Sequence, residues 1–261
     1  MHSSSVSEFY DQIAERYHLI YPDWDASIRR QAGHLNSVIR EFFPSTSRIL
    51  DVSCGIGTQA LGLSEIGYQI VASDISPASC ERARREADSR GLSIDIRVGD
   101  MRSISSDHKD IDLIIACDNA LPHLLDRSEI LNTFQGFHSH LPNGGGCIIS
   151  VRDYATIDFS EDRLVPYGIR TDGSKRWLLF QAWHPDSPFY DLDLYFVEDT
   201  GGTRCDTFVS RSRYLAISIS DLMDLMREAG FSEVVRLDER YFQPIILGKK
   251  NTAEQGAAAN P

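Results

Sequence analysis

The stretch Ile49–Ala60, ILDVSCGIGTQA, decides the fold of this chain together with an acidic residue at Asp74. An apolar strand precedes Gly55 and Gly57, and because glycine has no Cβ the backbone turns tightly there and passes close to a ligand. A helix is expected to begin at Thr58, and a second apolar strand ends in Asp74. This order of elements predicts a nucleoside-binding βαβ unit whose terminal acid accepts the ribose hydroxyls.

Two cofactors compete for this loop. Gly55-x-Gly57-x-x-Ala60 satisfies the dinucleotide form of the motif, so NAD is one of them. Asp51 ends the first strand, and its carboxylate would repel a pyrophosphate but attract a ligand that carries an ammonium and a sulfonium. The sequence therefore favours S-adenosylmethionine, and a purely structural glycine turn is the remaining interpretation.

Composition narrows the classes of protein that fit. The chain has 261 residues and a formal net charge of −12, which predicts one acidic α/β domain with an elaboration. Lys and Arg gather only in pairs, which argues against nucleic acid or an anionic membrane surface as a partner. No apolar run reaches the roughly 18 residues of a membrane span, and the opening MHSSSVSEFY does not resemble a signal peptide. Five cysteines without C-x-x-C spacing predict a reducing, cytoplasmic location and no metal site.

The rhythm of the sequence changes after the fifth predicted strand. From Trp177 to Ile219 apolar and polar residues alternate, which predicts antiparallel strands that form a lid over the parallel sheet. The predicted strands 231–237 and 241–248 are expected to form a terminal hairpin. The expected divisions are a helical cap at 1–47, a cofactor-binding core at 48–153, the lid at 154–219, a C-terminal helix and hairpin at 220–250, and a disordered tail at 251–261.

Five landmarks in order resemble the class I S-adenosylmethionine-dependent methyltransferases over roughly residues 8–250. They are the glycine loop with Asp51, Asp74, Gly99-Asp100-Met101, Asp112–His123, and the turn Leu141-Pro-Asn-Gly-Gly. The resemblance implies an α/β fold: a Rossmann-like, seven-stranded, mostly parallel sheet with helices on both faces. Its last strand is antiparallel, and the β lid is inserted after strand five.

Two segments are similar to the glycine/sarcosine N-methyltransferase-like branch of that class. One is CDNALPHL at 117–124, with an Asn and a His among small and apolar residues, and the other is VRDY at 151–154. Asp153 stands where the branch has Asn, and Ala155 stands where it has an acid. These departures put a glycine substrate in doubt.

The pattern and the resemblance together assign a set of residues to the cofactor. Asp74 is expected to take the ribose diol, Asp100 the adenine amino group, and Met101 to cover the ring, while Arg30 or Arg29 would contact the cofactor carboxylate. The predicted cofactor-binding residues are Tyr17, Trp24, Arg30, Asp51, Ser53, Gly55, Gly57, Thr58, Asp74, Ile75, Asp100, Met101, Cys117, Asp118 and Asn119.

His123 and Tyr17 are the candidate catalytic residues. His123 is either a general base, a hydrogen-bond donor or a structural histidine, and Tyr17 either faces the sulfonium or packs in the core. Arg152 is a candidate for gripping a substrate carboxylate, or else it pairs with Asp153. The predicted substrate-binding residues are Tyr10, Tyr21, His123, Arg152, Tyr154 and Trp183.

The function expected from these residues is methyl transfer to a small molecule, at an amine nitrogen of an amino acid-like metabolite. Transfer to oxygen, sulfur or carbon is the alternative within the class, and an oxygen or carbon acceptor usually needs a base. An NAD-dependent oxidoreductase and a catalytically silent partner subunit are two further alternatives. The sequence names neither the acceptor nor the oligomeric state.

Overall fold

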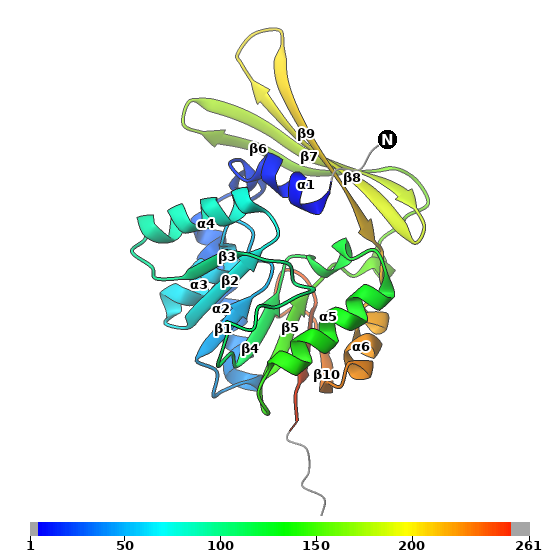
Figure 1. Ribbon diagram of the computed structural model, residues 1–261. Coiled ribbons are helices and arrows are strands. Elements are labelled where there is room, and N and C mark those ends of the chain that lie inside the picture. The colour runs from blue at the N-terminus through cyan, green and yellow to red at the C-terminus, as the bar shows by residue number, and fades with distance from the viewer. Residues whose placement is uncertain (1–4, 252–261) are drawn as a thin grey trace, which may run out of the picture.

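The computed structural model describes residues 5–251, which form a seven-stranded sheet and a separate four-stranded sheet (Figure 1). The strands of the larger sheet are β1 (Arg48–Asp51), β2 (Gln69–Asp74), β3 (Asp95–Val98), β4 (Leu113–Ala116), β5 (Gly146–Ser150), β10 (Ser232–Leu237) and β11 (Ile245–Lys249). Their order is β10-β11-β5-β4-β1-β2-β3, and β11 is antiparallel to both of its neighbours. The predicted mostly parallel sheet with a terminal hairpin is confirmed.

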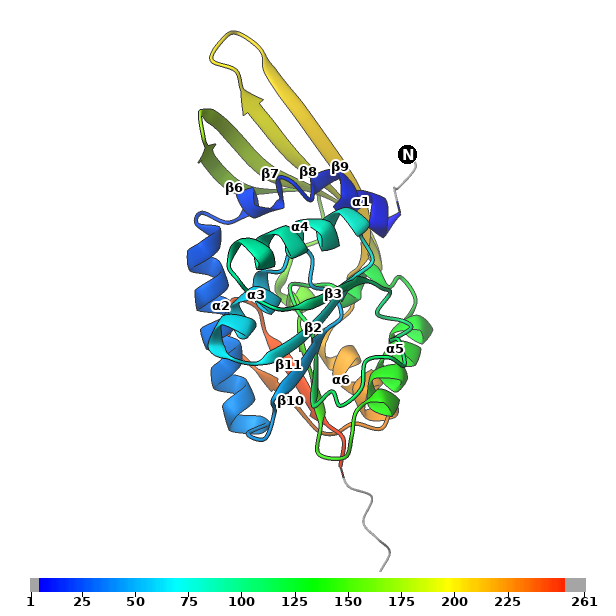
Figure 2. The same ribbon diagram turned by 60° about the vertical axis from the view of Figure 1, so that its left-hand side comes forward.

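Helices cover both faces of this sheet, as the two views in Figures 1 and 2 show. They are α2 (Trp24–Phe42), α3 (Thr58–Ile66) and α4 (Pro77–Ser89) on one face, and α5 (Arg127–His140) and α6 (Ile219–Glu228) on the other. Successive residues of β4 serve the two cores: Ile114 packs with α5 and α6, and Leu113 and Ile115 pack with α2 to α4. A parallel strand buried on both faces is therefore apolar throughout. Among residues 5–251, no helix combines the length and the apolar character needed to cross a membrane.

The second sheet is antiparallel and stands above the body of the molecule in Figure 1. Its strands are β6 (Arg163–Asp172), β7 (Lys175–Asp186), β8 (Phe189–Asp199) and β9 (Cys205–Leu215), in that order. The expected antiparallel strands are present, but they begin at Arg163 and not at Trp177. Pro166 and Gly168 interrupt the alternation of β6, so the sequence did not reveal this strand. Proline and glycine are tolerated there because β6 is an edge strand, and its register with β7 shifts between these two residues.

The first two helical segments, α1 (Val6–Ile13) and the 3-10 turn η1 (Tyr17–Ile20), lie between the two sheets (Figure 1). α1 buries Phe9 and Ile13 against the inner face of the second sheet. On its other side Asp11 accepts hydrogen bonds from Ser76 Oγ at 2.6 Å and from the backbone N–H of Ala78 at 3.0 Å, at the beginning of α4. α1 is thereby fixed as a roof above the carboxyl ends of the parallel strands.

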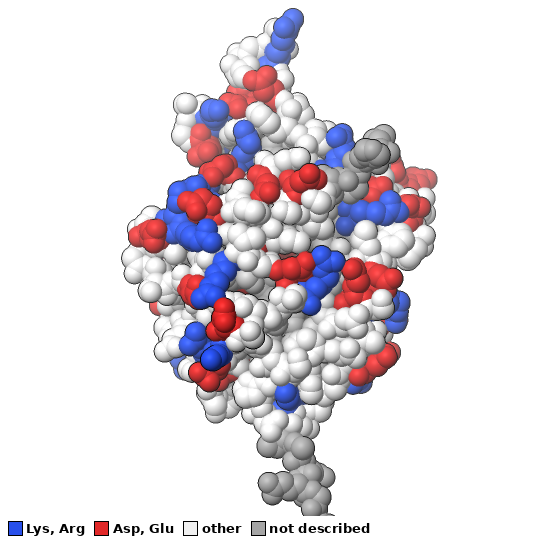
Figure 3. Space-filling model, viewed as in Figure 1, with Lys and Arg blue, Asp and Glu red and all other residues white. Residues whose placement is uncertain are grey.

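Acidic and basic side chains alternate over the face of the molecule in Figure 3. Several of them join the N-terminal segment to α4: Arg82 and Arg85 both pair with Glu15, and Arg90 pairs with Asp25. Exposed ion pairs contribute only about 0–1 kcal/mol each. They orient the N-terminal segment on α4, while the apolar contacts of α1 supply most of its attachment.

Candidate active site

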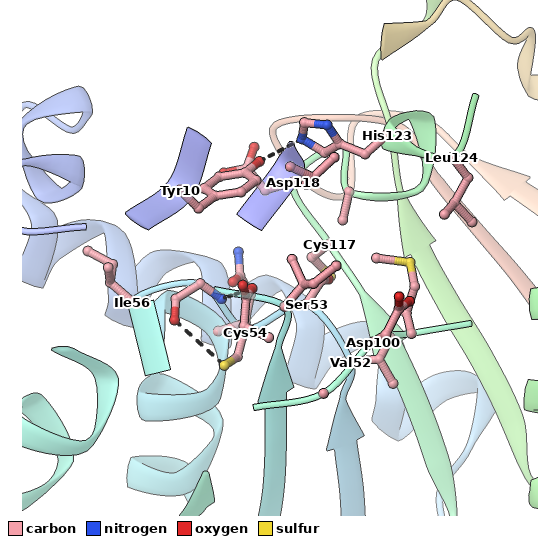
Figure 4. A pocket seen from close by; sticks show the side chains of 18 of the residues that line it. Tyr10, Val52, Ser53, Cys54, Ile56, Asp100, Cys117, Asp118, His123 and Leu124 are labelled. Atoms are coloured by element: carbon pink, nitrogen blue, oxygen red, sulfur yellow. Dashed lines mark hydrogen bonds between the residues drawn. The ribbon is translucent and has the colours of Figure 1, made fainter. Parts of the chain in front are cut away.

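A cavity of about 300 Å³ lies between the carboxyl ends of β1, β2, β3 and β4 and the roof formed by α1 and η1 (Figure 4). Small-molecule sites begin at about this size, and open α/β sheets bind ligands at this edge. The cavity brings together predicted residues from five separate segments. The predicted residues that line it are Tyr10, Tyr17, Tyr21, Ser53, Gly55, Thr58, Asp74, Ile75, Asp100, Met101, Cys117, Asp118 and His123.

The glycine loop forms the floor of the cavity. Gly55 has φ +53°, and a Cβ built there would meet no atom within 4 Å, because it would point into open space. Gly57 has φ +99°, and a Cβ there would lie 3.1 Å from the Leu61 side chain, so this glycine serves the packing of α3 behind the loop. Both positions favour glycine because L side chains rarely adopt a positive φ.

Asp74 ties the end of β2 to the glycine loop. Its carboxylate accepts hydrogen bonds from the backbone N–H groups of Gly55 at 2.8 Å and Ser76 at 2.9 Å. Burial raises the pKa of Asp74 to about 6, although these two hydrogen bonds favour the charged form. Asp74 faces the cavity from the position predicted for a ribose-binding acid.

Asp51 and Ser53 leave two buried oxygen atoms without a partner. Asp51 Oδ1 accepts from the Ser53 N–H at 3.2 Å, but Asp51 Oδ2 and Ser53 Oγ make no hydrogen bond within the described chain. Burial raises the pKa of Asp51 to about 7. An unsatisfied buried polar group costs about 1–3 kcal/mol, so a ligand with a cationic donor would be stabilised beside these atoms. The ammonium of S-adenosylmethionine is a cationic donor of this kind.

A charged network closes the opposite end of the cavity. Arg102 donates to Asp100 Oδ2 at 2.6 Å through Nη2 and to Glu129 Oε1 at 3.0 Å through Nη1, which links the loop after β3 to α5. Burial opposes ionisation of Asp100, but the bonds from Arg102 hold its pKa below the ordinary value. Arg102 thus holds Asp100 in place at the cavity, and its contact with the adenine amino group stays a prediction.

Aromatic side chains and two polar groups form the end of the cavity under α1. The Tyr10 hydroxyl lies 2.9 Å from His123 Nε2, and the Tyr21 hydroxyl donates to Asp118 Oδ2 at 3.3 Å. Burial and, to a smaller extent, the charge of Arg152 together lower the pKa of His123 to about 3. Burial also raises the pKa of Tyr10, Tyr17 and Tyr21, so these phenols are neutral.

Arg152 lies outside the cavity lining, in an aromatic surround behind the same end. Its guanidinium donates to the Tyr190 hydroxyl at 3.1 Å and stands 5.2 Å from the Trp183 ring. No Asp or Glu between residues 5 and 251 approaches it within 4.0 Å. The alternative that Arg152 pairs with Asp153 is wrong, because Asp153 pairs with Arg236 at 2.6 Å.

Asn119 and Tyr154 also lie outside the lining and join the ends of two strands. Asn119 Nδ2 donates to the Tyr154 hydroxyl at 2.8 Å, and Asn119 Oδ1 accepts from the backbone N–H of Arg152 at 3.0 Å. These bonds connect the turn after β4 to the segment after β5. The two residues shape the wall of the site from behind.

Trp24, Arg30, Asp51, Gly57 and Trp183 complete the predicted residues that do not line the cavity. Trp24 Nε1 donates to Thr58 Oγ1 at 2.9 Å behind the glycine loop. Arg30 is exposed and donates to Ser27 Oγ on its own helix, because α2 packs beside α3 and not over the cavity. The placement of Arg30 gives no support to its predicted contact with the cofactor.

Several lining residues were not among the predicted set: Val6, Val52, Cys54, Ile56, Gln59, Gly99, Arg102, Ala120, Leu124, Leu125 and Glu129. Most of them are sequence neighbours of predicted residues, so naming each motif as a continuous loop would have found them. Val6 and Glu129 carry no such signal. They reach the cavity only because α1 and α5 pack against it.

The chain is similar to known methyltransferases in sequence and in fold. Residues 49–145 match the family model described as a methyltransferase domain. The chain is 39% identical over 79 residues to a ubiquinone biosynthesis O-methyltransferase of Methylocella silvestris, covering 30% of each chain. It is 25% identical over 148 residues to a glycine/sarcosine N-methyltransferase of Parasynechococcus marenigrum, covering 56% of this chain and 51% of the relative. These two matches thus span about half or less of the relatives' lengths.

Solved structures extend the similarity to the whole fold. CalS10 of Micromonospora echinaspora, described as an amino pentose methyltransferase with S-adenosylmethionine bound, superposes with a TM-score of 0.74 at 16% identity. The match covers 86% of this chain and 92% of CalS10. The family match, the shared fold and the cavity at the glycine loop agree: residues 49–145 match a methyltransferase domain, and the chain has the fold of S-adenosylmethionine-dependent methyltransferases.

Proposed function

We propose that the protein transfers a methyl group from S-adenosylmethionine to an amine nitrogen of a small, amino acid-like metabolite. The bound cofactor supplies an electrophilic methyl group on a sulfonium. The observation that carries the proposal is a pair of separated charges at one end of the site. Asp118 lines the cavity there, and Arg152 stands near it without a carboxylate partner among residues 5–251. An amino acid would offer an ammonium to the first group and a carboxylate to the second.

The state of His123 favours a nitrogen acceptor over an oxygen acceptor. A hydroxyl must lose its proton as it attacks, and efficient proton transfer needs a base whose pKa lies near the working pH. With a pKa of about 3, His123 is a poor base for that purpose. A neutral amine already has the lone pair that attacks the methyl group.

The cofactor side follows from the contacts at the loop. In this proposal Asp51 and Ser53 bind the ammonium of S-adenosylmethionine, Asp74 the ribose diol and Asp100 the adenine amino group. Tyr10, Tyr17 and Tyr21 form the aromatic wall next to the sulfonium, which is attracted to ring faces. Rate acceleration then comes largely from alignment of nitrogen, methyl and sulfur in one line.

The division of labour within the chain follows the predicted segments. We assign cofactor binding to 48–153 and the acceptor side to the N-terminal segment 1–47 and the lid 154–219. The predicted tail lies almost wholly outside the described residues. The similarity to the glycine/sarcosine N-methyltransferase supports an N-methyltransferase branch, and Asp153 and Ala155 point to an acceptor other than glycine.

The five cysteines are all unpaired. This accords with a reducing compartment, and we propose the cytoplasm. The proposed partner is a small-molecule acceptor and not nucleic acid, in keeping with the acidic composition.

The first experiment is calorimetry with S-adenosylmethionine, S-adenosylhomocysteine and NADH. We expect both adenosyl ligands to bind and NADH not to bind. Acceptors are then screened in matched pairs, each amine beside the alcohol that replaces it, with and without a carboxylate. Methylation of the amine but not the alcohol supports the proposal, and a preference for alcohols would refute it.

A further inference from the structure

Asp118 sits in a strained turn that points its side chain into the cavity. Asp118 has φ +56° and Asn119 has φ +66°, and two consecutive residues other than glycine rarely adopt this conformation. Both backbone N–H groups are held by Ser150: that of Asp118 donates to Ser150 Oγ at 2.8 Å and that of Asn119 to Ser150 O at 2.9 Å. Strain of this kind concentrates at functional sites, where the surrounding structure maintains it.

The Asp118 carboxylate is weakly satisfied at the end of the cavity beneath α1 (Figure 4). It accepts from the Tyr21 hydroxyl at 3.3 Å and from Gln243 Nε2 at 3.4 Å, both long for hydrogen bonds to a charged group. No Lys, Arg or His between residues 5 and 251 lies within 4.0 Å of it. A carboxylate with this much unused capacity is suited to an incoming cation.

Of the titratable groups that surround Asp118, one carries a charge. They come from α1, η1, β6 and the segments after β4, β5 and β10, and they are Tyr10, Tyr17, Tyr21, Cys117, Arg152, Tyr167 and Tyr241. Burial raises the pKa of each phenol and of the thiol, so among these groups only Arg152 is charged. Burial also raises the pKa of Asp118, while Arg152 and the Tyr21 hydrogen bond oppose the rise.

We propose that Asp118 is a catalytic residue that takes a proton from the acceptor ammonium; this rests on the proposed function. The proton passes from nitrogen to a carboxylate oxygen, which frees the lone pair. The nitrogen attacks the methyl carbon, the carbon–sulfur bond breaks, and its electron pair stays on sulfur as a neutral thioether. The methylated ammonium leaves, and the Asp118 proton passes to water.

This role differs from the cofactor contact that the sequence predicts for Asp118. The ammonium of the cofactor is already matched by Asp51 and Ser53 at the glycine loop, which have unpartnered oxygen atoms. Asp118 instead shares its end of the cavity with Tyr10, Tyr21 and His123. The two interpretations make opposite predictions for cofactor affinity.

The test is Asp118→Asn, because asparagine matches the size of aspartate and tolerates a positive φ. Thermal melting checks that the variant folds, and Tyr21→Phe is the matched control that removes one hydrogen bond and keeps the carboxylate. We expect the Asp118→Asn variant to bind S-adenosylmethionine within about threefold of wild type and to lose about 10²-fold or more in kcat/KM for the best amine. Its remaining activity should rise about tenfold per pH unit up to the pKa of the free amine, whereas wild type levels off earlier.

Three results would overturn the assignment in different ways. If the Asp118→Asn variant binds S-adenosylmethionine at least tenfold more weakly while its pH–rate profile matches wild type, Asp118 serves the cofactor. If the variant keeps both affinity and profile, Asp118 takes no proton although the protein is an amine methyltransferase. If the wild-type enzyme methylates no amine in the matched screen, the proposed function and this inference both fail.

Discussion

The Tyr10 hydroxyl and His123 Nε2 lie 2.9 Å apart and share a hydrogen bond across 113 residues of sequence. Burial raises the pKa of Tyr10 and lowers the pKa of His123 to about 3, so both partners are neutral. The other ring nitrogen, Nδ1, lies 3.3 Å from Ser212 Oγ. His123 thus joins α1 to β9 through both of its ring nitrogens.

His123→Ala should therefore affect binding of the acceptor more than chemistry. We expect kcat at saturating acceptor to stay within about threefold of wild type. KM should rise, because α1 loses the hydrogen bond between Tyr10 and His123. Tyr10→Phe removes the same hydrogen bond and should change KM in the same direction. A loss of 10²–10⁴-fold in kcat for the alanine variant alone is the signature of a general base and would contradict the assignment.

Affinity for S-adenosylmethionine should depend on pH through Asp51. The ammonium binds the charged carboxylate, and with a pKa of about 7 the charged fraction falls about tenfold between pH 8 and pH 6. Calorimetry should show Kd about tenfold weaker at pH 6 than at pH 8. Asp51→Asn should bind more weakly at pH 8 and lose most of this slope. An equally steep slope in the variant would place the titration elsewhere.

Stability without cofactor should move in the opposite direction with pH. The folded-state pKa values of Asp51 and Asp74, about 7 and about 6, are raised above the ordinary value of 3.8 for an aspartate. The stability that their neutral forms contribute is complete below the unfolded pKa and is lost as pH rises through the folded values. Denaturant unfolding should give a lower free energy at pH 8 than at pH 5.5, with a smaller difference in Asp51→Asn.

Arg152→Lys and Arg152→Gln test the recognition of the acceptor carboxylate. Lysine keeps the charge but cannot make two parallel bonds, so we expect KM for a carboxylate-bearing acceptor to rise about tenfold with lysine and about 10²-fold with glutamine. Acceptors without a carboxylate and S-adenosylmethionine itself provide the controls. Equal losses for both kinds of acceptor would make Arg152 a structural residue of the aromatic surround.

Gly62→Ala should destabilise the packing of α3 on α2. A Cβ at Gly62 would lie 2.7 Å from both the Ala32 Cβ and the Ile28 carbonyl oxygen, so the helices must separate, at a cost of about 1–3 kcal/mol. Gly136→Ala in α5 is the control, because a Cβ there meets nothing within 4 Å and should stabilise the protein by about 1 kcal/mol. Denaturant midpoints of the two variants should therefore shift in opposite directions.

The residues on the cofactor side of the site could be predicted from short sequence motifs. The glycine loop, Asp74 and Asp100 are each positioned by the end of a strand only a few residues away, so their spacing was enough to predict where they lie. The roof was harder to predict. Tyr10, Tyr17 and Tyr21 were proposed for the site, but their meeting with His123 depends on docking between remote segments.

The features that the sequence placed less well also depend on contacts between remote segments. Trp24 and Arg30 lie on a helix whose periodicity was clear, but the sequence does not say which neighbour a helical face meets, and α2 meets α3. Strand β6 was missed because Pro166 and Gly168 break its alternation at a sheet edge. Glu129 lines the cavity from α5 and accepts from Arg102, 27 residues earlier in the chain, and no local pattern signals this contact.

The attachment of α1 to the second sheet has a consequence for the order in which the site is assembled. Ser210 Oγ donates to the backbone oxygen of Phe9 across 201 residues, and Arg170 Nε donates to that of Tyr21 across 149. During synthesis the glycine loop can acquire its neighbours early, but α1 must wait for β9 before its place is secured. A chain released before β9 is made would have much of the cofactor-binding loop region but would lack the β9 contact that holds α1 above it. The acceptor side of the cavity can therefore form only after β9 has been synthesised.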